Sequence, residues 1–307
     1  MSTVLTTATA TARRALRTVF AEAGVQGHLF ARDVDGRAAV GLDEDAPVAP
    51  ASVFKIPIAL AYACAAEAGR LERTERHAVP LVPRDGGIGV SGCADPVEMS
   101  LRDLVGMMLT MSDNAATDVV LRRVGLARVN ELLARLGRHD TRLVGGCADL
   151  IGTLLAELGA SSVAEAQSVL AALPPEGITR LSVCVPGRTT RSTARDTAAL
   201  LTQIWRDEAG PAAACREVRD VMARQIWPHR LASGFGDDYR VAGKTGTLPG
   251  WRNEAGVVEH RDGGRYAVAV FTRARDIRSG RSGGGQGHRA GGPDRGRRAP
   301  GPVAAGR

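Results

Sequence analysis

A long helical stretch enclosed by strands at both ends of the chain constrains the fold of this sequence more than any other feature. Residues 27–33 and 37–42 alternate like two short strands around Asp35-Gly36, a dipeptide that favours a two-residue hairpin turn. Three further strands are predicted near the other end, over residues 239–243, 254–260 and 265–272. Strands from both ends can form one antiparallel sheet, with the intervening chain inserted as a separate lobe.

From Ser52 to about Ala209 the hydrophobic spacing is helical. A hydroxyl residue followed three positions later by an acid is the pattern of a capped helix start. Three such pairs occur here, Ser100 with Asp103, Ser162 with Glu165, and Thr193 with Asp196. Apolar residues recur behind each pair at intervals of three and four, so we expect an all-helical lobe.

The predicted fold class is therefore α/β, of the α+β kind, with an antiparallel sheet flanked by terminal helices and an inserted all-helical lobe. Residues 1–276 are expected to form a single two-lobed domain, with an α/β lobe over 12–50 and 210–276 and a helical lobe over 51–209. Residues 277–307 contain ten Gly, three Pro and seven Arg but few apolar side chains. Such a segment buries too little surface to offset its ordering, so we predict a disordered tail.

The net charge of +7 is concentrated in that tail, which holds seven Arg and one Asp. The rest of the chain is close to neutral, and nucleic-acid binding needs basic residues gathered on one face. We therefore expect no nucleic-acid partner for the folded part. An arginine-rich arm that binds RNA or an anionic surface remains an alternative for the tail itself.

Five widely spaced cysteines favour neither a disulfide framework nor a zinc site, and each is read as a small buried side chain. The first residues lack the basic start and apolar run of a secretion signal, and no stretch reaches transmembrane length. The expected location is the cytoplasm, with no membrane association, no metal and no cofactor.

Only Lys55 and Lys244 are lysines among the 40 basic Lys and Arg residues. A lysine amine is compact and can lose its proton in a buried site, which a guanidinium cannot do. Lys55 ends the tetrapeptide Ser52-Val53-Phe54-Lys55, whose two polar side chains share one face of a helix. A hydroxyl beside such an amine is an activated nucleophile.

Two more motifs give that pair a context. Ser112-Asp113-Asn114 follows a predicted amphipathic helix, and Lys244-Thr245-Gly246-Thr247 lies near the last strands. Ser-x-x-Lys, Ser-Asp-Asn and Lys-Thr-Gly, in that order, are the signature of class A β-lactamases and penicillin-binding proteins. Over residues 12–276 the chain resembles this serine hydrolase family, which implies a β-lactamase/transpeptidase-like fold.

The resemblance implies that Ser52 attacks a lactam, amide or ester carbonyl, with Lys55 as the candidate base. Ser112, assisted by Lys244, would pass a proton to the departing nitrogen, and the backbone N–H groups of Ser52 and Thr247 would form the oxyanion hole. The expected partner is a small molecule, a β-lactam or a related amide or ester, bound by a monomer, and the implied setting is antibiotic resistance. The implied substrate-binding residues are Asn114, Thr245, Gly246, Thr247 and Arg252, with Lys244 also at the substrate carboxylate.

The chain departs from the family at the residue expected to activate the deacylating water. Class A β-lactamases have a glutamate there, and the alignment places Cys147 at its position, with Asp149 two residues on. Acylation and deacylation are separate barriers, so we expect an acyl-enzyme that is released slowly. A D-alanyl peptidase or esterase acting on non-lactam substrates, and a non-turnover penicillin-binding or sensing protein, stay open as alternatives.

Two further observations bear on the class of protein. No Gly-x-Ser-x-Gly elbow occurs and none of the six histidines has a catalytic setting, which argues against a Ser-His-Asp hydrolase. The family also closes with a long amphipathic helix, whereas this chain passes into its Gly/Arg-rich tail after Asp276. We therefore expect one face of the sheet to be partly bare.

Overall fold

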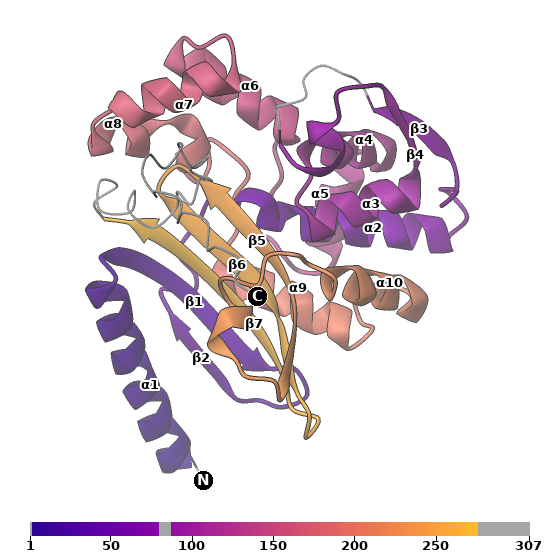
Figure 1. Ribbon diagram of the computed structural model, residues 1–307. Helices are drawn as coiled ribbons and strands as arrows, with labels where there is room; N and C mark the ends of the chain where they lie inside the picture. The colour runs from indigo at the N-terminus through magenta and orange to yellow at the C-terminus, as the bar shows by residue number, and fades with distance from the viewer. Residues whose placement is uncertain (1, 80–86, 276–307) are drawn as a thin grey trace, which may run out of the picture.

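The computed structural model describes residues 2–79 and 87–275, and its centre is one five-stranded antiparallel sheet in the order β2-β1-β7-β6-β5 (Figure 1). Its strands are β1 (Val25–Asp33), β2 (Ala39–Leu42), β5 (Tyr239–Leu248), β6 (Trp251–His260) and β7 (Arg265–Ala274). Strand β1 pairs with β7 along its whole length, from Val25 opposite Ala274 to Asp33 opposite Tyr266. The two ends of the chain therefore share one sheet, as the sequence predicts.

The segment between β2 and β5 is mostly helical. Its helices are α2 (Lys55–Glu67), α3 (Leu101–Thr110), α4 (Asn114–Val124), α5 (Leu126–Arg135), α6 (Cys147–Leu158), α7 (Val163–Ala172), α8 (Pro175–Arg180), α9 (Ala194–Trp205) and α10 (Ala212–Met222). The predicted caps form, because Ser100, Ser162 and Thr193 accept hydrogen bonds from the N–H groups three residues on. Each cap satisfies a helix donor that would otherwise lack a partner.

The prediction of an all-helical lobe is wrong in one place. Strands β3 (Arg76–Val79) and β4 (Val97–Ser100) pair as a small antiparallel ribbon at the edge of the lobe. Each strand has only four residues, too few to show the alternation that marks a strand in the sequence. Arg76 and Glu98 lie within the pair and their side chains form a salt bridge.

Helices cover the two faces of the sheet unequally (Figure 1). Helix α9 packs across β1, β6 and β7 on one face, where Ala267, Ala269 and Phe271 of β7 are completely buried. On the other face α1 (Ser2–Glu22) packs on β1 and β2. Tyr266 at the start of β7 is 44% exposed, in keeping with the expected bare area of sheet.

Helix α2 forms the centre of the core, since eleven of its thirteen residues are buried. Such a helix is apolar all round, as is typical of one surrounded by other elements. It packs against α10, α4, α5 and α3, and its first turn carries Lys55. The buried helix α2 therefore fixes the position of Lys55 and of the predicted site.

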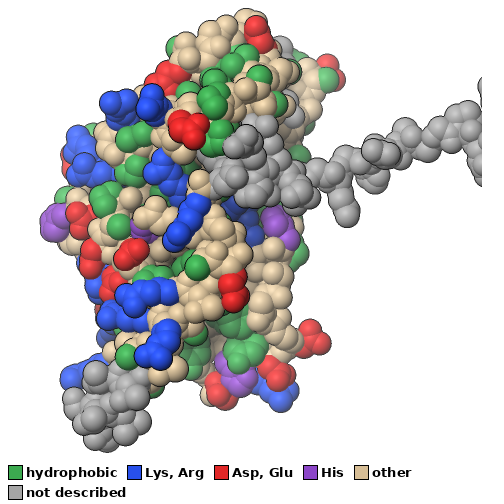
Figure 2. Space-filling model, turned by 90° about the vertical axis from the view of Figure 1, so that its left-hand side faces the viewer, with side chains coloured by type: hydrophobic (Ala, Val, Ile, Leu, Met, Phe, Trp, Pro, Cys, Tyr) green, Lys and Arg blue, Asp and Glu red, His purple; other side chains and the backbone are tan. Residues whose placement is uncertain are grey.

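On the face shown in Figure 2, acidic side chains lie among the numerous basic ones, which is the pattern of a solvated surface. Over the described residues, no single helix is long and apolar enough to cross a membrane. Helices α6 and α7 meet that test only when joined as a pair bent by 52°. The predicted disordered tail, 277–307, lies outside the described residues.

Candidate active site

Ser52 lies in a tight turn, the 3-10 helix η1 (Ala51–Phe54), immediately before α2. Ala51 enters the turn with a φ of 50°, a left-handed conformation that costs a non-glycine residue energy. The side chain of Ser52 is partly exposed, and its hydroxyl makes no hydrogen bond to any described residue. The predicted nucleophile is therefore held at a helix start with its hydroxyl accessible.

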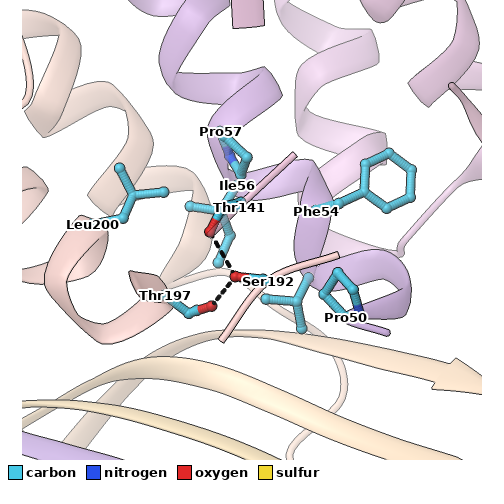
Figure 3. Close-up of a pocket in the computed structure, with 9 residues that line it drawn as sticks. Pro50, Phe54, Ile56, Pro57, Thr141, Ser192, Thr197 and Leu200 are labelled. Atoms are coloured by element: carbon cyan, nitrogen blue, oxygen red, sulfur yellow. Dashed lines mark hydrogen bonds between the residues drawn. The ribbon is translucent and has the colours of Figure 1, made fainter. Parts of the chain in front are cut away.

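A small cavity of about 20 Å³ lies behind the turn (Figure 3). Pro50, Phe54 and Ile56 line it on the turn's side. Opposite them, Ser192 Oγ lies 2.8 Å from Thr141 Oγ1 and 3.0 Å from Thr197 Oγ1. This hydroxyl chain joins the loop at Thr141 to the start of α9, so the backbone behind Ser52 is held by hydrogen bonds.

Lys55 is completely buried, and its amine joins α2 to the Ser-Asp-Asn segment. Lys55 Nζ donates to Ser112 O at 2.7 Å and to Asn114 Oδ1 at 2.9 Å. Ser112 Oγ and Asp113 O lie at 3.4 Å from the same nitrogen. The structure brings together the first two motifs, but through Ser112 and Asn114 and not through a direct Ser52 to Lys55 hydrogen bond.

Asp113, the middle residue of the Ser-Asp-Asn motif, stabilises the local fold. Its carboxylate accepts from Ala116 N at 3.0 Å, which caps α4, and from Ser91 Oγ at 2.7 Å. Ser112 before it has a φ of 66°. The cap and the loop contact hold this unfavourable conformation in place, and Ser112 is thereby kept beside Lys55.

Gly246 brings the third motif against the Ser52 turn. A Cβ built on this residue would lie 2.5 Å from Pro50 O and 3.1 Å from Ser52 N. Only glycine allows β5 to approach the turn this closely. Thr245 N–H donates to Gln225 Oε1 at 2.6 Å, outside the ladder with β6. Because donors alternate along a strand, Thr247 N–H lies on the same outer edge as Thr245.

Lys244 is the second completely buried lysine, and its Nζ donates to Thr245 O at 2.9 Å. Burial, followed by the positive charge of Lys55, holds the pKa of Lys244 well below its ordinary value. Lys244 therefore gives up its proton more readily than an ordinary lysine does. The sequence analysis assigned the role of candidate base to Lys55, and that assignment stays a prediction.

A residue beside the third motif that the sequence analysis missed is Arg230, in the loop after α10. Its guanidinium donates to Gly246 O at 2.8 Å, to Asn253 O at 2.6 Å and to Thr247 Oγ1 at 2.7 Å. Burial lowers the pKa of Arg230 from its ordinary value. No local pattern marks this arginine, which lies fourteen residues before Lys244 and reaches β5 only through the tertiary fold.

Buried Glu254 holds the Arg230 loop in position. Its carboxylate accepts from Leu231 N at 2.7 Å and from Gln225 Nε2 at 2.9 Å. The predicted substrate ligand Arg252 lies opposite Thr247 on β6. Arg252 Nη1 donates to Trp251 O at 2.8 Å and to Leu248 O at 3.1 Å, both in its own hairpin. Its predicted contact with substrate stays a prediction.

Cys147, at the position expected for the deacylating glutamate, is the first residue of α6 and is 5% exposed. Cys147 N donates to Asp118 Oδ1 at 2.7 Å and Ala148 N to Asp118 Oδ2 at 2.9 Å. Burial raises the pKa of Asp118, although these two N–H groups oppose the change. Asp118 therefore fastens the start of α6 to α4, a role that the sequence analysis did not find.

The other carboxylates in this region are engaged elsewhere. Asp149 Oδ2 accepts from Gly146 N at 2.8 Å and so caps α6. Glu157 accepts from Ser182 N at 2.8 Å, and Glu165 accepts from Ser161 N at 2.7 Å. The described residues contain no group of three or more His, Cys, Asp or Glu side chains that could hold a metal.

Comparisons with known proteins agree with this geometry. The chain is 29% identical over 279 residues to the β-lactamase regulatory protein BlaB of Streptomyces cacaoi, with 85% of this chain and 88% of that protein covered. A β-lactamase of Sphaerobacter thermophilus superposes with a TM-score of 0.66 at 25% identity, covering 84% and 87% of the two chains. A PBP-A mutant, solved as an acyl-enzyme complex with penicillin G, superposes with a TM-score of 0.67 at 21% identity over 87% and 89%.

These structures confirm the predicted β-lactamase/transpeptidase-like fold, with its antiparallel sheet and helical lobe. Residues 11–286 match the sequence profile of the β-lactamase enzyme family. With the Ser-x-x-Lys, Ser-Asp-Asn and Lys-Thr-Gly motifs brought to one place in that fold, the chain belongs to the β-lactamase enzyme family.

Proposed function

We propose that this protein is acylated by β-lactams at Ser52 and releases the acyl group slowly, so that it senses these compounds more than it destroys them. One observation carries the proposal: the three motifs lie together, while α6 begins with buried Cys147 where the family resemblance places the water-activating glutamate. The similarity to a protein named as a β-lactamase regulator supports the sensing role.

In the acylation step, Ser52 Oγ forms a bond to the lactam carbonyl carbon and the ring C–N bond breaks. The hydroxyl proton leaves Ser52 and an equivalent proton reaches the lactam nitrogen through Ser112. The amine of Lys55, 3.4 Å from Ser112 Oγ, and the readily deprotonated amine of Lys244 support this transfer. Positioned proton transfer of this kind contributes about 10²–10⁴-fold in rate.

The negative charge on the carbonyl oxygen would be held by the N–H groups of Ser52 and Thr247. Gly246 supports this assignment, because it brings the outer edge of β5 next to Ser52 N. Such fixed donors stabilise a tetrahedral intermediate by about 3 kcal/mol each. Asn114, whose Oδ1 accepts from Lys55, is proposed to bind the substrate's side-chain amide.

The substrate carboxylate would lie against Thr245, Thr247 and Lys244. Arg230 adds a guanidinium that is already bonded to Thr247 Oγ1 at 2.7 Å. A guanidinium suits this task, since its planar donors match the two oxygens of a carboxylate. Arg230 thus takes the place that the sequence analysis proposed for Arg252.

Release of the acyl group requires water to attack the ester at Ser52. A thiol at the start of α6 cannot replace a carboxylate base efficiently. At neutral pH a carboxylate is ordinarily ionised and can accept a proton from water, whereas a thiol is mostly protonated. Asp149 is engaged as the cap of its own helix. We therefore expect formation of the ester to be much faster than its hydrolysis.

Intact-mass measurement after addition of benzylpenicillin tests the proposal. Wild-type protein is expected to gain the mass of one whole penicillin, and peptide mapping is expected to place it on Ser52. The Ser52→Ala variant is the control and should gain nothing. Rapid hydrolysis without a lasting adduct would identify a true β-lactamase. Neither adduct nor hydrolysis would overturn the proposal and favour an esterase or D-alanyl peptidase.

A further inference from the structure

A second cavity opens in the helical lobe, between α2 and α5, which lie side by side (Figure 1). It has a volume of about 260 Å³. Ala61, Cys64 and Ala65 of α2 line its inner side. They follow Lys55 by six to ten residues, which along a helix is roughly 9–15 Å. The cavity is therefore separate from the site at Ser52.

Small or apolar side chains form the inner surface of this cavity. Val124 at the end of α4 and Leu132 of α5 complete it, and both are buried. Burial raises the pKa of the Cys64 thiol to about 11, so its sulfur is uncharged at neutral pH. The floor thus offers apolar contact to a ligand and no negative charge.

Three arginines surround the opening: Arg70 after α2, and Arg128 and Arg135 on α5. The positive charges of Arg135 and Arg70 both favour a lower pKa of the Cys64 thiol, against the larger effect of burial, so both act on the cavity floor. Arg128 and Arg135 are seven residues apart, two helical turns, and so share one face of α5. Glu131 lies between them and is the single carboxylate of the lining.

None of these three arginines forms a salt bridge or side-chain hydrogen bond with any described residue. Elsewhere in the same lobe arginines are paired, as Arg73 is with Glu217 at 2.8 Å and Arg123 is with Glu75 at 2.6 Å. Unpaired like charges around one cavity repel each other, and an anion would relieve that repulsion. The lining therefore favours a negatively charged ligand.

We propose that this cavity binds a small organic carboxylate, with its apolar body on the floor of α2 and its carboxylate among Arg70, Arg128 and Arg135. A cavity of about 150 Å³ is large enough for benzene, so an aromatic or branched aliphatic acid fits this one. A bound ligand would contact the helix whose first turn carries Lys55. The site is distinct from the proposed carboxylate contact at Arg230.

Titration of the full chain with 4-fluorobenzoate, followed by fluorine NMR, tests this proposal. Saturable binding is expected for wild-type protein. The double variant Arg128→Gln and Arg135→Gln should bind at least about tenfold more weakly, given the modest energy of exposed ion pairs. Arg17→Gln on α1 is the matched control, since Arg17 is exposed and makes no side-chain hydrogen bond or salt bridge with described residues. It should bind as wild type does.

Two comparisons separate this site from others. Arg230→Gln should leave fluorobenzoate binding unchanged, and a loss there would place the ligand in the active site and overturn the proposal. Neutral 4-fluorobenzyl alcohol should bind much more weakly than the acid, while inorganic phosphate should compete poorly because it lacks an apolar body. Equal binding by phosphate would contradict the assigned ligand class.

The folding of each variant is checked by circular dichroism and thermal unfolding. Should the double variant fail to fold, Arg70→Gln on the opposite side of the opening carries the same expectation of weaker binding. No binding by wild-type protein, or equal binding by the folded variants, would refute the site.

Discussion

The surroundings of Lys55 and the start of α6 face the same site, yet they differ in what their side chains can do with a proton. Lys55 contacts Ser112 and Asn114, and its charge acts on Lys244 nearby. At the start of α6 the side chain at the expected glutamate position is Cys147, and two carboxylates close by, Asp118 and Asp149, accept from the backbone at the start of this helix. Under the proposed function the first region moves protons, whereas the contacts of the second hold the start of a helix.

Under the proposed function, the two halves of an acyl-transfer cycle depend on different regions of the molecule. Forming the ester needs a nucleophile, an amine and an oxyanion hole, and these depend on η1, α4 and β5. Hydrolysing it needs a base for water, and that depends on α6. Because the two steps have separate barriers, a change confined to α6 alters the lifetime of the ester and not its formation.

Replacing Lys244 should produce the largest effect on acylation. Lys244→Ala removes the amine whose pKa burial lowers, so adduct formation with benzylpenicillin should slow by about 10³-fold. Timed intact-mass sampling measures the rate. Arg240→Ala is the control, since Arg240 is an exposed residue of the same strand. An unchanged rate in Lys244→Ala would show that the amine takes no part.

Gly246→Ala should slow acylation by displacing β5, without removing any reacting group. The added Cβ would meet Pro50 O at 2.5 Å, so β5 must move away from Ser52. Displacement of this kind can slow a reaction by about 10²-fold. Gly106→Ala in α3 is the matched control, because a Cβ there meets nothing within 4 Å. Equal acylation rates for the two variants would argue against an oxyanion hole beside Gly246.

Arg230 and Arg252, the two arginines near Thr247, should differ in their effect on substrate affinity. Arg230→Gln is expected to raise the benzylpenicillin concentration needed for half-maximal acylation by about tenfold, the value of one hydrogen bond to a charged group. Arg252→Gln should change it little, since Arg252 donates to its own hairpin. The reverse order would restore the sequence-based assignment to Arg252.

The smallest effect concerns stability at alkaline pH. Lys244 has a lowered pKa when folded, so the unfolded chain binds more protons between that value and about 10.5. The free energy of unfolding should therefore rise with pH in this window. Lys244→Met, which cannot titrate, should show a flatter pH dependence in urea unfolding. Identical slopes would mean that Lys244 keeps its proton in the folded protein.

Local sequence patterns were sufficient for the sheet and for the caps at Ser100, Ser162 and Thr193, and the family resemblance indicated that Lys55 and Ser112 share one site. They could not give Arg230, because its contact with Thr247 depends on a loop that Glu254 holds from another strand. The lowered pKa of Lys244 was not predicted either. Burial at Lys244 and the nearby charge of Lys55 are both consequences of packing, which no motif encodes.

The lifetime of the Ser52 ester tests the central claim most directly. After acylation and removal of excess benzylpenicillin, intact mass is followed in wild-type protein, Cys147→Glu and the carboxylate-free control Cys147→Gln. A lasting adduct is expected in wild type and in Cys147→Gln, and release at least about 10²-fold faster in Cys147→Glu. Rapid release by wild-type protein, with no gain from the glutamate, would contradict that claim.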